Sequence, residues 1–414
     1  MTRNTPHVLP NAQRTSWAYL GVGLLVLLTL VALTEVNYRF ALANPGGNDF
    51  LARWMGAHMW LKEGLSPYNE RVSLASQVAI YGRPADAGRG EDIAHFVYPL
   101  FSMLFFAPFG LFDYPLARAL WMTLLEVALV ALVPLSLRLA NYPARGKTLL
   151  AWVLFSILGY IGVRTIVLGQ FAGLNALLIV ASLVLICNHR DLAAGLVLAL
   201  TTSKPQMTFL LLPWVLLWAS STRRWRLVGG LLGGLAGLML GSLALIPTWP
   251  QQFLHQLMEY PTYTNRIGST LSIVAGLFPT LETPLNLLLH AGFAFFLGFA
   301  WWQAWGKGWP DFLYAALLTL VITNLIAPRT ATPHYAALLP AVFLIFHAME
   351  ARWGRWGTYA VWGWALLLFV GHWVLFLTTL VGDMESAWMY LPLPIFCLVG
   401  LLWARRWWLA EARS

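Results

Sequence analysis

Two residues that lie far apart in the chain have the chemistry of a general base. Asp49 follows the first apolar segment, in the run Pro-Gly-Gly-Asn-Asp-Phe at 45–50, where a carboxylate could take a proton from a hydroxyl group or hold a cation. His334 follows a turn with two prolines, and histidine titrates near neutral pH. Each has a simpler interpretation: Asp49 could cap a helix that starts near Phe50, and a single histidine is often only structural.

Three cations lie within or beside apolar segments, where a charge is costly and suggests a function by default. They are Lys204, Arg329 and, as a weaker candidate, Arg164. A lysine and an arginine that converge suit a phosphate group, because one supplies a point charge and the other a fork of donors. The alternative is that these side chains extend to the membrane surface or pair with a nearby acid.

A second set of polar side chains could line a cavity and contact a sugar. Gln170 and Asn175 lie in a polar, glycine-bearing break between two apolar runs, and such breaks tend to line cavities. They could equally cap helix ends. Tyr98, next to Pro99, could form a cavity rim. We find no P-loop, dinucleotide fingerprint, zinc-like spacing or nucleophile elbow, so we expect no cofactor and leave a need for a divalent metal open.

The composition is that of a membrane protein. Hydrophobic residues make up 59% of the 414 residues, charged residues 10%, and the mean hydropathy is +0.66. A soluble domain has about 25% charged residues. Lipid requires the backbone to satisfy its own polar groups, and apolar runs without strict alternation favour helices over a barrel. The net charge of +9 is explained by basic cytoplasmic loops, so we expect no nucleic-acid partner.

The predicted fold is a single all-α integral membrane domain over 1–414, with about twelve transmembrane helices. The run Ala41–Ala43 resembles a signal-peptidase site, but the apolar run before it is too long for a signal peptide. We expect 41–94 to be a long extracytoplasmic loop with juxtamembrane helices, one of them amphipathic over Leu51–Glu63, and 95–112 to be re-entrant or juxtamembrane. The expected spans are 17–40, 116–139, 148–163, 171–188, 191–203, 206–219, 227–246, 284–304, 311–327, 333–349, 357–379 and 387–405.

Basic clusters orient these helices. By the positive-inside rule we expect the clusters and both termini to be cytoplasmic. We expect the protein to lie in the inner membrane of a bacterial cell. The short segments 191–203 and 206–219 then form a hairpin that turns at Ser203–Pro205, on the extracytoplasmic side. The basic residues are Arg3, Arg14, Arg138, Arg145, Lys147, Arg223, Arg224, Arg226, Arg352, Arg355, Arg405 and Arg406. Cys187 and Cys397 fall in or beside expected helices and indicate no disulfide framework.

Several short motifs, in a fixed order from about 40 to 350, resemble a known family. They are Asp49, Gly64-Leu65-Ser66-Pro67-Tyr68, Phe96-Val97-Tyr98-Pro99-Leu100, Gly169-Gln170 with Asn175, Ala194-Gly195 ahead of Lys204-Pro205, and Pro328 with His334-Tyr335. Together they resemble glycosyltransferase family 87, the polyprenyl-phosphate-mannose-dependent mannosyltransferases of the GT-C superfamily.

The resemblance implies a GT-C-like bundle with a catalytic cavity at the outer membrane face. It implies a sugar donor linked to polyprenyl phosphate, a lipid or glycan acceptor, and a single inverting displacement. Carried over to this chain, Asp49 is the acid of the first extracytoplasmic loop, His334 is the late histidine, and Lys204 lies near the donor phosphate. Which of Asp49 and His334 is the base stays open.

Two other classes of protein remain as alternatives. A transporter or lipid-linked sugar flippase needs charge near the middle of the membrane and often has two similar halves. We see no repeat, and Glu126 is the one acid well inside an expected span, where pairing with a neighbouring helix is the simpler interpretation. A non-catalytic membrane scaffold is the third class.

Overall fold

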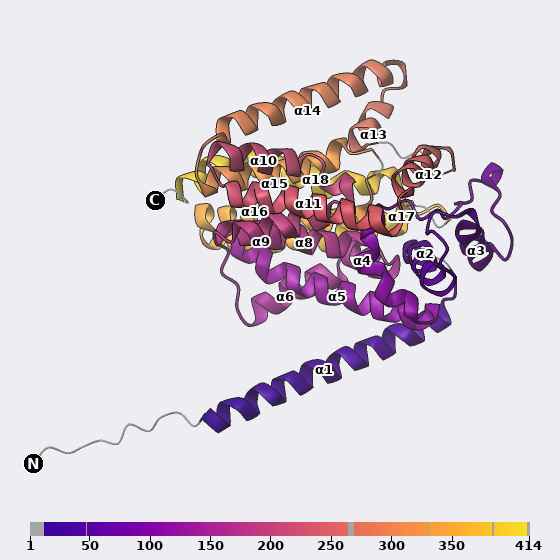
Figure 1. Cartoon of the computed structure of the whole chain (residues 1–414). Coiled ribbons are helices and arrows are strands. Elements are labelled where there is room, and N and C mark those ends of the chain that lie inside the picture. The colour runs from indigo at the N-terminus through magenta and orange to yellow at the C-terminus, as the bar shows by residue number, and fades with distance from the viewer. Residues whose placement is uncertain (1–11, 47, 264–268, 329, 383–384, 412–414) are drawn as a thin grey trace, which may run out of the picture.

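The computed structural model describes residues 12–46, 48–263, 269–328, 330–382 and 385–411. In this part of the chain the long helices lie side by side with their axes roughly aligned, as a bundle (Figure 1). The prediction of an all-helical membrane protein is confirmed at this level.

Eight helical segments are long and apolar enough to cross a membrane in the described part of the chain. They contain α1 (Ala12–Ala43), α5 (Tyr114–Leu139), α11 (Trp225–Leu245), α14 (Glu282–Ala304), α15 (Trp309–Ile326), α16 (Leu339–Trp353, preceded by the 3₁₀ turn η6, Thr332–Leu338), α17 (Arg355–Thr379) and α18 (Pro392–Glu411). A ninth arises if α6 (Lys147–Leu158) and α7 (Tyr160–Val167), which meet at a 51° bend, form one broken span.

The predicted count of about twelve spans is not confirmed, because four apolar segments are short. They are α8 (Ala172–Cys187), α9 (Asp191–Thr201), α10 (Leu211–Ser221), and Leu100–Leu111, which consists of η2 (Leu100–Ser102), α4 (Met103–Phe106) and η3 (Ala107–Leu111). An 11-residue helix is about 17 Å long, whereas the hydrocarbon core is about 30 Å thick. The connection between α9 and α10, which contains η4 (Pro205–Met207), therefore lies part-way along the bundle.

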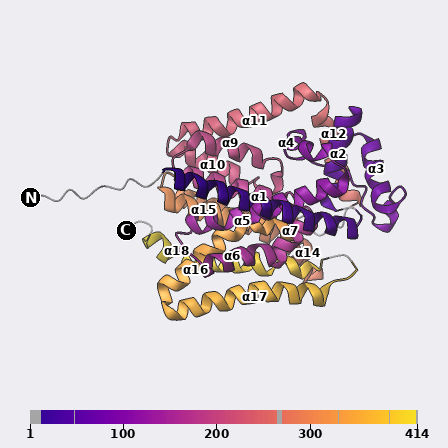
Figure 2. The same cartoon turned by 90° about the horizontal axis from the view of Figure 1, so that it is seen from below.

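The end of the bundle opposite the start of α1 and the end of α18 carries helices that do not run with the bundle (Figures 1 and 2). They are α2 (Asp49–Glu63), α3 (Glu70–Tyr81), α12 (Trp249–Tyr263) and α13 (Thr270–Gly276), with the short turns η1 (Ala87–Arg89), η5 (Pro279–Leu281) and η7 (Ala387–Tyr390). Ser66 Oγ donates to Gln252 Oε1 at 2.7 Å, and Gln256 Nε2 donates to the Tyr68 carbonyl at 3.1 Å. These contacts fix the segment after α1 against α12.

Basic residues collect at the end of the bundle that carries the termini. Arg138 Nη2 donates to Asn188 Oδ1 at 2.6 Å, which joins the end of α5 to the end of α8. Arg224 pairs with Asp191, which joins the starts of α11 and α9. Arg138 and Arg224, from two of the basic clusters that the sequence analysis placed on one side, thus lie at the same end of the described structure.

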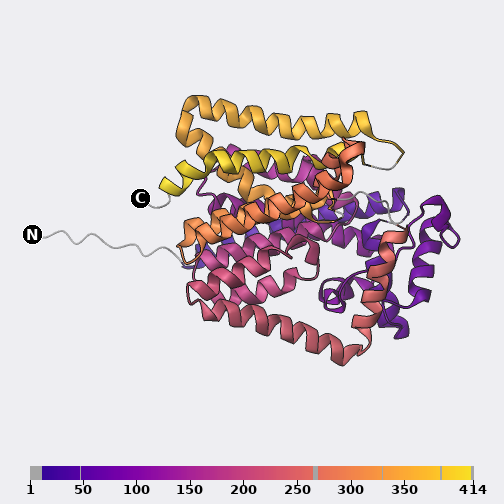
Figure 3. The ribbon, with the colours of Figure 1, turned by 90° about the horizontal axis from the view of Figure 1, so that it is seen from above.

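The centre of the bundle is formed by α15 and α16. In their apolar windows 78% and 83% of residues are buried, against 0% for α1 and 6% for α14. Helices α1 and α14 lie on opposite outer sides of the bundle (Figure 1). Helix α1 is in the foreground of the view from below (Figure 2) and α14 in that of the view from above (Figure 3), so their apolar residues would face lipid. Within the α1–α5 contact, Asn37 Nδ2 donates to Glu126 Oε2 at 2.9 Å. The acid inside a span therefore pairs with a neighbouring helix.

Candidate functional site

Asp49 is the first residue of α2 and does not cap it. The cap is Asn48, whose side-chain oxygen accepts from the Phe50 amide at 3.0 Å and whose Nδ2 donates to the Val167 carbonyl at 3.0 Å. The carboxylate of Asp49 instead accepts a hydrogen bond from Gln170 Nε2. The helix-cap interpretation of Asp49 is thereby replaced by a contact to a residue 121 positions away.

Gly169 allows this contact to form. Its φ of +64° lies in the left-handed region, and a Cβ placed there would lie 2.7 Å from Phe50 Cβ. Its carbonyl accepts from Trp121 Nε1 at 2.8 Å, and the ring of Trp121 stacks on Phe50 with centroids 5.0 Å apart. The start of α2 therefore packs directly on the break between α7 and α8, which brings Gln170 to the acid.

Lys204 lies on the other side of the Gln170 amide. Its Nζ donates to Gln170 Oε1 at 2.6 Å, and the residue is 3% exposed in the connection between α9 and α10. Burial lowers the pKa of Lys204, and the negative charge of Asp49 acts in the opposite direction. Gln170 thus separates the cation from the acid while bonding to both. The interpretation of Gln170 as a helix cap does not describe these contacts.

Several buried polar atoms close to Lys204 in the chain or the fold have no hydrogen-bond partner within the described structure. They are Ser203 Oγ, Thr208 Oγ1 and Asn175 Oδ1. The other side-chain atom of Asn175, Nδ2, lies 3.6 Å from the sulfur of Met207, between α8 and η4. A buried polar group without a partner costs roughly 1–3 kcal/mol, so these atoms are suited to the hydroxyl groups of a ligand.

His334 lies in η6 and is 2% exposed. Its Nδ1 accepts from the Ala331 amide at 3.3 Å, which orients the ring within its own turn. The side chain is close enough to Lys204 for the two to interact electrostatically. Lys204 also interacts electrostatically with Asp49, so both predicted bases lie within electrostatic range of the same cation.

Arg53 is a further candidate for this site, and the sequence analysis did not select it. It lies one helical turn after Asp49 on α2, and its guanidinium carbon is 4.8 Å from the centroid of the Tyr98 ring. It interacts electrostatically with Asp49, and its Nε is buried without a partner. The signal was present in the sequence, because residues four apart share a helix face. Tyr98, predicted at a cavity rim, is buried beneath this cation.

Arg164 belongs to a second polar cluster, arranged around Glu385. The Nε of Arg164 donates to Glu385 Oε1 at 3.0 Å, and the same oxygen accepts from Thr332 Oγ1 at 2.7 Å and from the Tyr160 hydroxyl. Glu385 Oε2 accepts from the Tyr390 hydroxyl at 3.1 Å. Arg164 is thus neutralised by an acid, and the cluster ties α7 to η6 two residues before His334.

Glu385 was not selected from the sequence. The available signal was an acid in the short polar gap between the expected spans 357–379 and 387–405. Arg329, the remaining predicted cation, lies outside the described residues. Among the residues that the structure describes, no three His, Cys, Asp or Glu side chains are grouped closely enough to hold a metal ion.

An apolar groove opens beside the second cluster, between α16, α17 and α18. Its volume is about 860 Å³, and it extends from Trp353 and Trp403 to Thr378 and Pro392. His372 lies both in this groove and at a smaller pocket of about 50 Å³ that Tyr160 also lines. The rings of His372 and Tyr160 stack with centroids 6.5 Å apart. The groove therefore leads towards Glu385 and η6.

The fold and these residues define a helical membrane protein in which a buried cation, a half-buried amide and a half-buried carboxylate are joined in one chain of contacts. Comparison with protein-family models assigns residues 96–328, more than half of the chain, to glycosyltransferase family 87. The chain belongs to this family, and the predicted resemblance is confirmed. Comparisons with curated proteins and with solved structures gave no significant match.

Proposed function

We propose that the protein transfers a sugar, mannose in our hypothesis, from a polyprenyl-phosphate donor to an extracytoplasmic lipid or glycan acceptor. The observation that carries the proposal is the chain of contacts Lys204–Gln170–Asp49. A cation and an acid held apart by one amide suit a reaction in which a proton leaves one substrate while a phosphate leaves the other. Family membership supports glycosyl transfer as the reaction class.

The proposed reaction is a single inverting displacement. The acceptor hydroxyl oxygen forms a bond to the anomeric carbon while the bond from that carbon to the phosphate oxygen breaks. Asp49 takes the hydroxyl proton, with His334 as the other candidate base. The leaving polyprenyl phosphate keeps the bonding electrons, so negative charge grows on its oxygen in the transition state.

The cations are proposed to stabilise this growing charge. Lys204 is held in place by Gln170 before any substrate binds, so little reorganisation is needed when the phosphate leaves. Arg53 offers a second positive group, one turn from Asp49. The unpartnered atoms of Asn175, Ser203 and Thr208 would receive sugar hydroxyl groups.

The groove between α16, α17 and α18 supports a substrate with a long apolar chain. It is lined mainly by apolar side chains, and it ends near the Glu385 cluster through His372 and Tyr160. An isoprenoid chain in this groove would keep its phosphate close to the polar interior of the bundle. We place the basic end on the cytoplasmic side, by the positive-inside rule, and the α2–α12 end outside the inner membrane.

The test is transfer of labelled mannose from polyprenyl-phosphate mannose in proteoliposomes. Wild-type protein should give a labelled acceptor, and Asp49→Asn should not, although the amide is nearly the same shape. Glu126→Gln serves as the control, because this acid pairs with Asn37 away from the proposed site. Full activity in Asp49→Asn would overturn the proposed role of the acid. Substrate movement across the membrane without any transfer would favour a transporter instead.

A further inference from the structure

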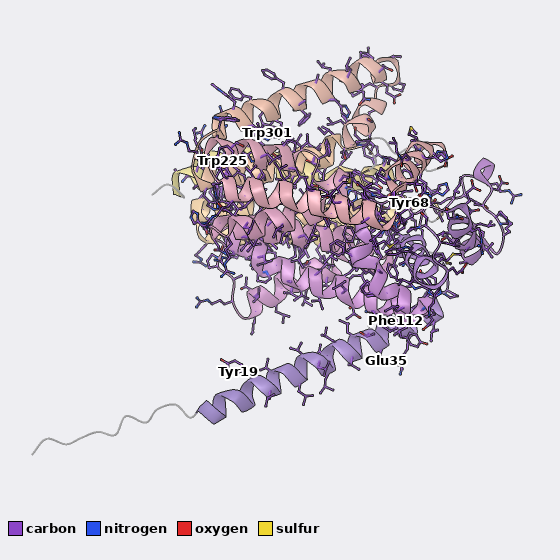
Figure 4. The ribbon with its side chains drawn as sticks, in the orientation of Figure 1. Tyr19, Glu35, Tyr68, Phe112, Trp225 and Trp301 are labelled. Carbon is purple, nitrogen blue, oxygen red and sulfur yellow. The ribbon has the colours of Figure 1, made fainter. Side chains whose placement is uncertain are left out.

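The basic end of the bundle contains a pocket that the proposed reaction does not use. It has a volume of about 650 Å³ and is formed where three helix-to-helix turns meet: α8 to α9, α10 to α11, and α14 to α15. Its charged lining consists of Arg223, Arg224, Arg226 and Lys307, against the acid Asp191. In the views of Figures 1 and 4 this end, marked by Trp225, lies away from α2 and Tyr68.

The pocket wall is held together by contacts between the turns. Arg224 pairs with Asp191 and donates to the Ile186 carbonyl at 2.8 Å, which joins two of the turns. Trp218 Nε1 donates to the Lys307 carbonyl at 2.8 Å, which joins the third. The three turns that form the pocket are therefore held together by the fold before a ligand binds.

Three cations remain for a ligand once Arg224 is assigned to Asp191. Arg223, Arg226 and Lys307 are exposed, and among the residues that the structure describes no acid forms an ion pair with any of them. The helices α9, α11 and α15 all begin at this pocket, and the unpaired amides at helix starts favour negative charge. Positive charge from side chains and from helix dipoles thus adds in one concave place. The positive-inside rule predicts cations at this end but not their collection in a hollow.

Tryptophans indicate the source of the anion. Trp225 and Trp309 line the pocket together with the cations, and Trp225 is 61% exposed. Tryptophan side chains prefer the boundary between headgroups and hydrocarbon. Leu192 and Leu232, on the helices that start here, are 56% and 51% exposed and would face acyl chains. A soluble anion would not need this apolar border.

We propose that this pocket binds the phosphate headgroup of an anionic phospholipid in the leaflet at the basic end of the bundle. The three free cations hold the phosphate, and the tryptophans set its depth. The lipid bridges the turns that begin α9, α11 and α15, and so stabilises the hairpin whose other end carries Lys204. The site is separate from the proposed catalytic residues and does not depend on the sugar or the acceptor.

The experiment compares full-length protein in vesicles of phosphatidylcholine alone and with one fifth phosphatidylglycerol. Bound lipid is measured by native mass spectrometry, and thermal stability is measured in parallel. The test variant is Arg223→Gln/Arg226→Gln/Lys307→Gln, and the control is Arg145→Gln/Lys147→Gln, which removes two exposed cations at the same end but outside the pocket. Arg224 is left unchanged, because it holds Asp191.

The expected result is a roughly 100-fold loss of phosphatidylglycerol binding in the test variant, since each of the three cations that hold the phosphate contributes about fivefold. The control should bind as wild type does. Phosphatidylglycerol should also raise the melting temperature of the wild type and the control but not of the test variant. Equal binding by all three proteins would overturn the proposal. So would displacement of the lipid by millimolar inorganic phosphate, which would identify a soluble anion as the ligand.

Discussion

The two polar clusters of the bundle hold their cations in different ways. Lys204 is bonded to a neutral amide, with the acid beyond it, whereas Arg164 is bonded directly to the buried carboxylate of Glu385. A cation with a neutral partner keeps its charge for a ligand. The charge of a cation in a close ion pair is largely cancelled by the acid, and removal of that cation leaves the acid unpaired. The first arrangement is suited to chemistry and the second to fixing η6.

The largest effect is expected from Asp49→Asn. If Asp49 is the base, its loss should lower kcat by about 10²–10⁴-fold, because the amide cannot take a proton. Its bond to Gln170 can be kept, so thermal stability should change little. Sugar transfer in proteoliposomes and a melting curve measure both. Loss of activity together with a large fall in stability would show that Asp49 has a structural role, like that of Glu385, and not a catalytic one.

A smaller loss is expected from Lys204→Met. Charged hydrogen bonds contribute about 1.5–3 kcal/mol, so kcat/KM for the donor should fall by roughly 10–100-fold. The variant Lys204→Arg keeps the charge and should retain more activity. The comparison of the two variants, measured at several donor concentrations, separates charge from shape. Equal losses in both would argue that geometry, not charge, is what Lys204 supplies.

The lowered pKa of Lys204 predicts a pH dependence. The ammonium exists below the pKa, so kcat/KM for the donor should fall as the pH rises through that lowered value, by up to roughly tenfold per unit. In Lys204→Arg the charge persists, so the fall should move to higher pH. A pH series on both proteins tests this, and an unchanged alkaline limb in the arginine variant would contradict it.

The smallest loss of activity is expected in the second cluster. Glu385→Gln should lower stability by about 2 kcal/mol, because Arg164 loses its charged partner, and should reduce transfer only severalfold. Removing both charges in Arg164→Met/Glu385→Gln should restore part of the stability. Thermal unfolding of Arg164→Met, Glu385→Gln and the double variant gives the coupling free energy between the two residues. An additive result would mean that the pair does not act as a unit.

The sequence predicted those features that depend on the residues of a single segment. The apolar runs gave the long helices and the hairpin near Lys204, and the break at Gln170 was recognised from its polarity. The predicted count of about twelve spans is not confirmed, because an apolar run of 11 residues looks like part of a span in the sequence although its helix is shorter than the hydrocarbon core is thick. The spacing of apolar residues along the chain does not show whether neighbouring helices cover the ends of such a short helix.

The partners of the site residues could not be predicted. Gln170 and Asp49 are 121 residues apart, and their contact depends on how α2 returns onto the bundle. Glu385 binds groups from α7 and η6, which no local pattern relates to its own segment. Arg53 is different, since its helical spacing from Asp49 could have shown it. Residue types and local spacing are visible in a sequence, but the closure of long loops is not.

Gly169 has a consequence for which substitutions the chain can accept. A methyl group at this position would press on Phe50 and act as a wedge under the first turn of α2. The carboxylate would then be lifted away from the amide that orients it, although no functional group had been altered. The absence of a side chain at Gly169 thus determines where the Asp49 carboxylate lies. A mutational scan should find that substitutions at position 169 reduce activity as much as substitutions at position 49.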